Sequence, residues 1–208
     1  MNLNVFFICF IKRVIVAGDG RYFNSEAMQI ICRVLAGNGV KNVWIPKGGI
    51  MSTPAVSAAI RTLNDGQAQG GIVLTASHNP GGPGEDFGIK YNEGFGQPAG
   101  EEFTEALYER SLKLTSFKTI EGSADVDLNA DVGTDFQLTE STTVTIIDPF
   151  GNYLQTLKKC FDFDALKEFA KREEFSILFD GMHGAGGPFA KKVFVDELGL
   201  PKVRYFGS

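Results

Sequence analysis

Short apolar runs rich in β-branched residues alternate with helical patterns along most of this chain of 208 residues. The first run, RVIVA at residues 13–17, ends at the turn GDG, where glycine permits a tight change of direction. Further runs lie at residues 41–45 and 71–76, and the latter, GIVLTA, is continuously apolar, as in a strand buried on both faces. The alternation predicts an α/β fold of mainly parallel sheet flanked by helices, with ligands bound outside the carboxyl ends of the strands.

Helical patterns occupy the segments between these runs. After the first strand, apolar residues recur at helical spacing until Gly37-Asn38-Gly39, a typical stop signal. Ser52-Thr53-Pro54 is typical of a helix start, because serine or threonine caps the end and proline is tolerated in the first turn. A third helix is predicted over residues 101–114, and its apolar stripe consists of Phe103, Leu107, Tyr108 and Leu114.

Residues 115–142 interrupt the alternation. They contain six acidic residues and one lysine, and are predicted to form an irregular connection or an extended ribbon. Regular elements then resume, with strands predicted at 143–148, 174–180 and 202–206 and helices at 164–172 and 188–198. We therefore predict a first domain over residues 12–142 and part of a second domain of similar architecture over residues 143–208.

Charge, hydropathy and cysteine usage exclude several classes of protein. The formal net charge is −5 and no basic run exceeds two residues, which argues against nucleic acid as the main partner. No apolar stretch approaches the roughly 18 residues that span a bilayer. Cys9, Cys32 and Cys160 are far apart and lack the spacing of a disulfide framework or a zinc site, so reduced thiols in a cytoplasmic protein are expected.

Residues 1–11 form an atypical lead-in. VFFICFI at residues 5–11 resembles the core of a signal peptide, but it is short and continues through Lys12-Arg13 directly into the first strand. An apolar lead-in to that strand is the preferred interpretation, and a signal peptide is the alternative.

The most distinctive loop follows the third strand. It begins Ser77-His78-Asn79-Pro80, continues through several glycines and reaches Lys90. A serine hydroxyl at a strand end, loop N–H groups and a lysine can together hold an anion. The residues alone leave an ordinary polar turn open as the alternative. A Ser-His hydrolase is disfavoured, because adjacent side chains rarely point at each other and no GxSxG elbow is present.

The segment TASHNPGGPGEDFGIKYN at residues 75–92 resembles the active-site loop of the α-D-phosphohexomutases, specifically the eukaryotic phosphoglucomutase and parafusin type. Three further segments resemble the same family: GDGR at 18–21, GGIMSTPAV at 48–56 and DGMHGAGGP at 180–188. The resemblance thus covers nearly the whole chain from about residue 13 onward.

This resemblance implies a role for each of three residues. Ser77 matches the serine that carries the phosphoryl group, His78 the histidine that positions or protonates groups around it, and Lys90 the lysine that takes part in proton transfer with the sugar hydroxyl. The implied reaction interconverts the hexose phosphates glucose 1-phosphate and glucose 6-phosphate through glucose 1,6-bisphosphate, which also serves as activator. The implied metal is Mg²⁺, bound to the phosphoryl oxygen on Ser77, with its other ligands absent from this chain.

Other matching motifs imply less. Arg21 is a candidate for substrate binding beside the phosphoserine loop, and a structural ion pair in which Asp19 and Arg21 brace the loop is the alternative. Ser52 and its neighbours are expected to cap a helix rather than contact a ligand. Asp180 and His183 lie in the turn that opens the second domain, where a structural role is favoured.

The DGDGDR-type magnesium loop of the family and its TSGLR-type start do not occur in this sequence. We therefore expect this chain to be a fragment or short form that is inactive as a mutase on its own. The alternative function is that of a non-enzymatic phosphoprotein, since parafusin-type relatives are associated with vesicle fusion. The sequence does not predict the oligomeric state.

Overall fold

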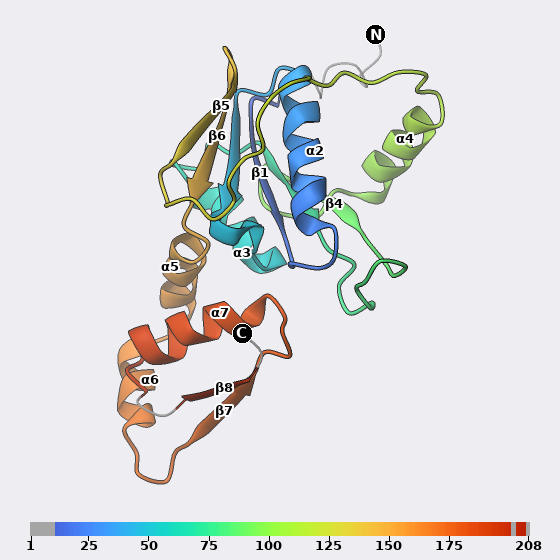
Figure 1. The fold of residues 1–208 in the computed structure, drawn as a ribbon. Helices are drawn as coiled ribbons and strands as arrows, with labels where there is room; N and C mark the ends of the chain where they lie inside the picture. The colour runs from blue at the N-terminus through green and yellow to red at the C-terminus, as the bar shows by residue number, and fades with distance from the viewer. Residues whose placement is uncertain (1–10, 201–202, 207–208) are drawn as a thin grey trace.

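The computed structural model describes residues 11–200 and the backbone of residues 203–206 (Figure 1). Except for Ile11, the lead-in and both interpretations of it lie outside the described residues, as does Cys9. Within these two ranges, no helix combines the length and the apolar composition needed to cross a membrane.

Six strands form the main sheet, in the order β4-β3-β1-β2-β6-β5. β1 (Arg13–Gly18) pairs in parallel with both β2 (Asn42–Pro46) and β3 (Gly70–Leu74), and β2 pairs in parallel with β6 (Thr142–Ile147). The two edge strands, β4 (Ile89–Glu93) and β5 (Asp135–Thr139), are antiparallel to their neighbours. The predicted α/β class with a mainly parallel, mixed sheet is confirmed.

Alternate residues of β1 contribute to two separate cores. Val14 and Val16 pack with buried residues of α2 (Asn24–Gly37), whereas Ile15 and Ala17 pack with buried residues of α3 (Thr53–Thr62). Side chains on a strand point alternately to opposite faces, so the continuously apolar β1 requires a helix on each side. Figure 1 shows α2 lying along the near face of this sheet.

The acidic connection is irregular up to residue 134 and then enters the hairpin formed by β5 and β6. Val126 and Leu128 from this connection are buried in the core beside α2. The Gln29 side chain exchanges two hydrogen bonds of 2.9 Å with the backbone of Val126. The predicted irregular connection therefore describes residues 115–134, which contribute to the core beside α2, and the alternative of an extended ribbon describes β5.

The predicted apolar stripe on the third helix is wrong. α4 (Glu101–Ser111) ends before Leu114 and contains no buried residue, and Leu107 and Tyr108 are exposed. The Phe103 ring stacks on Tyr91 of β4, with ring centroids 5.7 Å apart. α4 follows the edge strand β4, and of its residues only Phe103 is partly buried.

The remaining elements form a second, smaller unit (Figure 1). They are α5 (Gly151–Cys160), α6 (Phe163–Ala170), β7 (Ile177–Asp180), α7 (Gly186–Ala190), the π-helical η3 (Lys191–Glu197) and β8 (Val203–Phe206). β7 and β8 pair in parallel as a separate two-stranded sheet. Phe189 of α7 packs against Tyr153 of α5 at a centroid distance of 4.9 Å, and α5 packs on α3.

The strand predicted to open the second domain belongs to the main sheet. Thr143 of β6 pairs with Asn42 of β2, so a boundary between residues 142 and 143 cuts through that sheet. The strand pairing favours a boundary after Ile147 instead, and the division into domains stays a prediction.

Candidate functional site

The distinctive loop connects β3 to the antiparallel strand β4. Ser77 lies shortly after Leu74, the last residue of β3, at the carboxyl end of that strand. The turn after β1 reaches the same edge of the sheet, because the Asp19 backbone N–H donates to the Leu74 carbonyl oxygen at 3.0 Å. Two strand ends therefore supply side chains to one place.

Strand β4 brings Lys90 back to Ser77. In the antiparallel register Lys90 pairs with Val73 of β3, and its Nζ donates a hydrogen bond of 3.0 Å to Ser77 Oγ. Both residues are exposed. The sequence alone did not predict β4, whose residues IKYNE are largely polar. The structure thus joins two of the three residues for which the resemblance implies a catalytic role.

The backbone of Ser77 adopts the left-handed conformation, with φ of 56°. For a residue with a Cβ this conformation costs roughly 1–2 kcal/mol, and strained residues of this kind cluster at functional sites. The Ser77 backbone N–H donates to Thr75 Oγ1 at 2.9 Å, and its carbonyl oxygen accepts from Arg21 Nη2 at 3.3 Å. Both backbone polar groups of Ser77 are therefore held by side chains.

The Arg21 side chain donates hydrogen bonds to two backbone carbonyl oxygens of the loop. It is only 7% exposed, and its Nη1 donates to the Asp86 carbonyl oxygen at 2.7 Å. Arg21 Nε and Nη2 donate to the carboxylate of Asp19, with the shortest of these contacts at 2.9 Å. This geometry supports the bracing alternative, and substrate binding by Arg21 stays a prediction.

Asp19 is the anionic centre of the network. It accepts the contacts from Arg21 and a hydrogen bond of 2.6 Å from Thr75 Oγ1. Burial raises the pKa of the Asp19 carboxyl, but the hydrogen bonds from Arg21 and Thr75, together with the Arg21 charge, lower it more. The net pKa is below its ordinary value, so Asp19 is ionised at neutral pH.

His78 is exposed next to Ser77, and the part of the chain that the structure describes offers it no hydrogen bond or ion pair. The neighbouring Asn79 is fixed, because its Nδ2 donates to Asp86 Oδ2 at 2.8 Å. The Asp86 backbone N–H in turn donates to the Pro80 carbonyl oxygen at 3.2 Å. The loop thus holds its own backbone while leaving the histidine ring accessible.

The remaining candidates do not join this site. Ser52 occupies the N-cap position of α3, but its side chain accepts no hydrogen bond from the helix. Asp180 Oδ1 accepts from the Met182 backbone N–H at 2.9 Å, closing a turn in which His183 is exposed with φ of 59°. This turn geometry supports the structural role that was favoured for Asp180 and His183.

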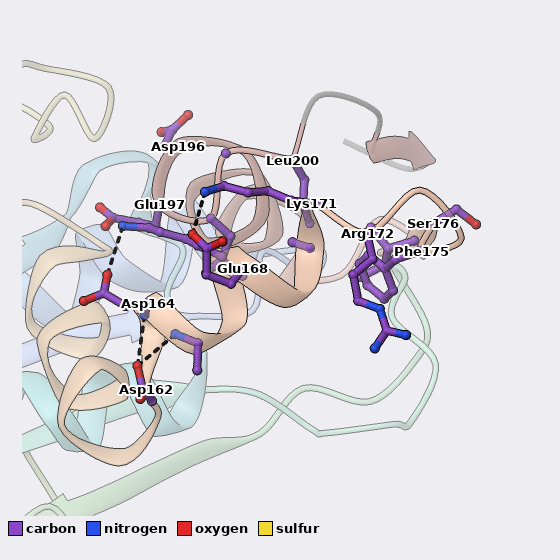
Figure 2. Close-up of a pocket in the computed structure, with 16 residues that line it drawn as sticks. Asp162, Asp164, Glu168, Lys171, Arg172, Phe175, Ser176, Asp196, Glu197 and Leu200 are labelled. Carbon is purple, nitrogen blue, oxygen red and sulfur yellow. Dashed lines mark hydrogen bonds and ion pairs between the residues drawn. The ribbon is translucent and has the colours of Figure 1, made fainter.

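A cavity of about 1000 Å³ lies in the second unit, between α6, η3 and the segment leading to β7 (Figure 2). Several of its charged side chains are engaged in local contacts: Lys171 Nζ is 2.5 Å from Glu168 Oε1, and Asp162 accepts from the backbone N–H groups that begin α6. None of Ser77, His78 and Lys90 lines it. The cavity is therefore separate from the candidate site.

Among the described residues, no group of three or more His, Cys, Asp and Glu is arranged to hold a metal ion. At the candidate site the charged partner of Ser77 Oγ is the cation Lys90. These residues therefore do not make a magnesium site by themselves.

The comparison with protein families and the comparison with individual proteins lead to the same group of proteins. The family described as phosphoglucomutase/phosphomannomutase, alpha/beta/alpha domain I, matches residues 10–118. The chain is 45% identical over 190 residues to the cytoplasmic phosphoglucomutase of Bromus inermis, covering 89% of this chain and 33% of that protein. It is 48% identical over 190 residues to the phosphoglucomutase of Aspergillus fumigatus, covering 91% of this chain and 33% of that protein.

A solved structure agrees with these comparisons. The open form of pp63/parafusin from Paramecium, described as an exocytosis-sensitive phosphoprotein and phosphoglucomutase, superposes with a TM-score of 0.87 at 40% identity. The match covers 96% of this chain and 37% of that one. The chain therefore spans about a third of the length of the curated relatives it matches.

Proposed function

The chain belongs to the phosphoglucomutase/phosphomannomutase family, and from this premise we propose that it carries the phosphoserine loop of a phosphoglucomutase, with Ser77 as the residue that holds the phosphoryl group. The single observation that supports this most is the contact of 3.0 Å between Ser77 Oγ and Lys90 Nζ. An exposed hydroxyl held beside a lysine is suited to receive and release a phosphoryl group, since such transfer depends mainly on positioning and positive charge.

The proposed step is a transfer between oxygens. The bond between phosphorus and Ser77 Oγ breaks as phosphorus forms a bond to a hydroxyl oxygen of the hexose phosphate, and the proton of that hydroxyl passes to a base at the site. Lys90 lies where it can offset the charge that develops on Ser77 Oγ or take part in that proton transfer. The reverse transfer, from the other phosphate of the bisphosphate, restores phosphoserine.

His78 and Arg21 take different parts in this proposal. His78 is exposed beside the nucleophile, so its ring can approach a bound phosphate without rearrangement of the loop. The Arg21 side chain is almost buried, and its guanidinium donates to Asp19 and to the carbonyl oxygens of Ser77 and Asp86, so it acts on Ser77 through the loop backbone. We retain substrate binding by Arg21 only as the alternative to this bracing role.

Phosphoglucomutases generally depend on Mg²⁺, and the proposal includes Mg²⁺ and glucose 1,6-bisphosphate as cofactor and activator. The metal would supply positive charge at the phosphoryl oxygen of Ser77. Its other ligands are not among the described residues of this chain, which hold no cluster of acidic, histidine or cysteine side chains suited to a metal.

The proposed substrates are hexose phosphates, and the proposed location is the cytoplasm. The relatives from Bromus inermis and Zea mays are named cytoplasmic, although one from Arabidopsis thaliana is named chloroplastic. The second candidate function is that of a regulatory phosphoprotein, which the description of the Paramecium structure as an exocytosis-sensitive phosphoprotein favours. In both functions Ser77 is the phosphorylated residue.

The test is to locate the phosphate. Wild type, Ser77→Ala and Ser52→Ala are incubated with glucose 1,6-bisphosphate and Mg²⁺, and intact-mass and peptide-fragment analysis follow. We expect one phosphate on Ser77 in wild type and Ser52→Ala and none in Ser77→Ala. Phosphate that persists in Ser77→Ala would identify a different nucleophile.

Turnover is a separate question, because the chain spans about a third of its relatives' length. A coupled assay for glucose 6-phosphate formation compares this chain with a chimera that appends the remainder of the Aspergillus fumigatus relative. We expect turnover from the chimera and little or none from the 208 residues alone. Robust turnover by the short chain, abolished by Ser77→Ala, would contradict that expectation.

A further inference from the structure

Thr75 is a buried polar residue to which neither the motif resemblance nor the proposed reaction assigns a role. It follows the last residue of β3 and is only 6% exposed. Its backbone N–H donates to the Gly88 carbonyl oxygen at 2.8 Å, so the position of Thr75 is set by the strand that returns to Lys90. Its hydroxyl takes part in two hydrogen bonds, one with the Asp19 carboxylate and one with the Ser77 backbone N–H.

The polarity of these two bonds is determined by chemistry. An ionised carboxylate only accepts hydrogen bonds, so Thr75 Oγ1 must donate its proton to Asp19 Oδ2, which lies 2.6 Å away. The lone pairs of the same oxygen then accept the Ser77 backbone N–H at 2.9 Å. The hydroxyl therefore has one defined orientation, with the charge of Asp19 on one side and the Ser77 amide on the other.

The two hydrogen bonds of the Thr75 hydroxyl help to hold the strained backbone of Ser77. The left-handed φ of 56° persists only where neighbouring groups hold it. Thr75 holds the Ser77 N–H, and Arg21 holds the Ser77 carbonyl oxygen. Both side chains are themselves bound to Asp19.

We propose that Thr75 is a positioning residue of the phosphoserine site, whose hydroxyl transmits the fixed position of Asp19 to the Ser77 backbone and thereby aims Ser77 Oγ at Lys90. This inference rests on the proposed function of Ser77. It also has a consequence for phosphate recognition: the Ser77 N–H is already engaged by Thr75, so the phosphoryl group on Ser77 is held by side chains and by other loop N–H groups.

The test uses three variants of the full chain. Thr75→Val removes the hydroxyl and keeps the branched shape, and Thr75→Ser keeps the hydroxyl and is the rescue. The matched control is Thr142→Val, because Thr142 is also buried and its Oγ1 donates a hydrogen bond of 2.7 Å to the Val40 carbonyl oxygen, in a different part of the sheet. A role that is merely structural would make the two valine variants behave alike.

The first readout does not depend on phosphoryl transfer. Amide hydrogen exchange at Ser77, measured by NMR, should accelerate about tenfold in Thr75→Val, as expected for loss of one hydrogen bond, and stay near the wild-type rate in Thr75→Ser and Thr142→Val. An unchanged rate in Thr75→Val, or equal acceleration in Thr142→Val, would overturn the proposal. If Thr75→Val does not fold, slower Ser77 exchange in Thr75→Ser than in Thr75→Ala decides the same point.

The second readout is the rate of Ser77 phosphorylation by glucose 1,6-bisphosphate. We expect it to fall at least about tenfold in Thr75→Val and to be restored in Thr75→Ser. Equal rates in wild type and Thr75→Val would overturn the positioning role. If wild type itself acquires no phosphate, the proposed function fails, while the exchange measurement still decides whether Thr75 positions Ser77.

Discussion

Among the described residues, β1 and β7 each lead into an adjacent Asp-Gly pair, Asp19-Gly20 and Asp180-Gly181, and only the first pair belongs to the candidate site. Asp19 follows β1, which has a parallel strand on each side, and Arg21 and Thr75 donate hydrogen bonds to its carboxylate. Asp180, the last residue of β7, is exposed and accepts a hydrogen bond from the Met182 backbone N–H in the turn that follows. The same local motif therefore becomes part of a site only where an adjacent strand end supplies side chains that bind the aspartate carboxylate.

The position of each strand explains this difference. β1 lies inside the six-stranded sheet, so the end of β3 and the start of the antiparallel β4 lie close to its turn. β7 pairs with β8 alone in the part of the chain that the structure describes. An aspartate turn at the centre of a sheet can thus be built into a network, whereas one in a two-stranded sheet closes on itself.

The largest expected effect of a single substitution on the stability of the fold is at Gly88. A Cβ at this position would lie 2.3 Å from the Thr75 carbonyl oxygen, in the backbone that carries the site. We expect Gly88→Ala to lower the free energy of unfolding by about 3 kcal/mol or to displace the loop. Denaturant unfolding measures the change.

Two alanine controls sharpen this result. A Cβ at Gly84 would have no neighbour within 4 Å, and a Cβ at Gly184, in the turn after β7, would lie 3.1 Å from the Gly181 carbonyl oxygen. Both substitutions should cost less than about 1 kcal/mol. A cost for Gly184→Ala equal to that for Gly88→Ala would erase the contrast between the two turns.

The next effect is that of Arg21. Arg21→Met keeps much of the side-chain stem and removes the guanidinium, leaving the partly buried Asp19 carboxylate without its cation. We expect a loss of about 2–3 kcal/mol in thermal or denaturant unfolding. Arg172→Met, which removes an exposed arginine paired with Glu174, should cost at most about 1 kcal/mol.

The acid dependence of stability tests Asp19 in particular. Its pKa is lowered in the folded protein, so its contribution is present at pH values above the unfolded pKa and is lost as the pH falls through the folded pKa. Asp19→Asn should therefore reduce the difference in stability between about pH 6 and strongly acidic solution. Asp180→Asn is the control of equal charge, and the same reduction in that variant would mean that net charge explains the effect.

The smallest expected effect compares two helix starts. Asp162 accepts hydrogen bonds from two backbone N–H groups of α6, so Asp162→Ala should cost about 1 kcal/mol. Ser52 makes no such bond at the start of α3, so Ser52→Ala should cost less than about 0.5 kcal/mol. Thermal unfolding of both variants checks the order, and a larger loss for Ser52→Ala would contradict it.

The sequence predicted the strands whose apolar residues are also buried in the folded protein. β1, β2 and β3 are apolar runs buried on both faces, so their signal is strong. β4 and α5 were not predicted: β4 is a half-exposed edge strand with polar residues, and α5 follows Phe150, which makes no side-chain cap. Their formation depends on neighbours that are distant along the chain.

The residues of the candidate site likewise fall into those that the sequence singled out and those that it did not. Motif resemblance singled out Ser77, His78 and Lys90, and the assignment of their roles stays a prediction. Thr75 and Asp86 were given no role in the site, because their partners Asp19 and Arg21 come from the turn after β1, far away in the sequence. A threonine directly before the Ala-Ser of the loop is a weak signal without knowledge of which turn lies beside it.

The contact between Ser77 and Lys90 is the centre of this account, and the rate of Ser77 phosphorylation in Lys90→Met tests it most directly. The reaction uses glucose 1,6-bisphosphate and Mg²⁺ and is followed by intact mass, with Lys191→Met as the matched control for an exposed lysine. We predict a rate at least about 10²-fold below wild type for Lys90→Met and an unchanged rate for Lys191→Met. Equal rates for Lys90→Met and wild type would contradict the account.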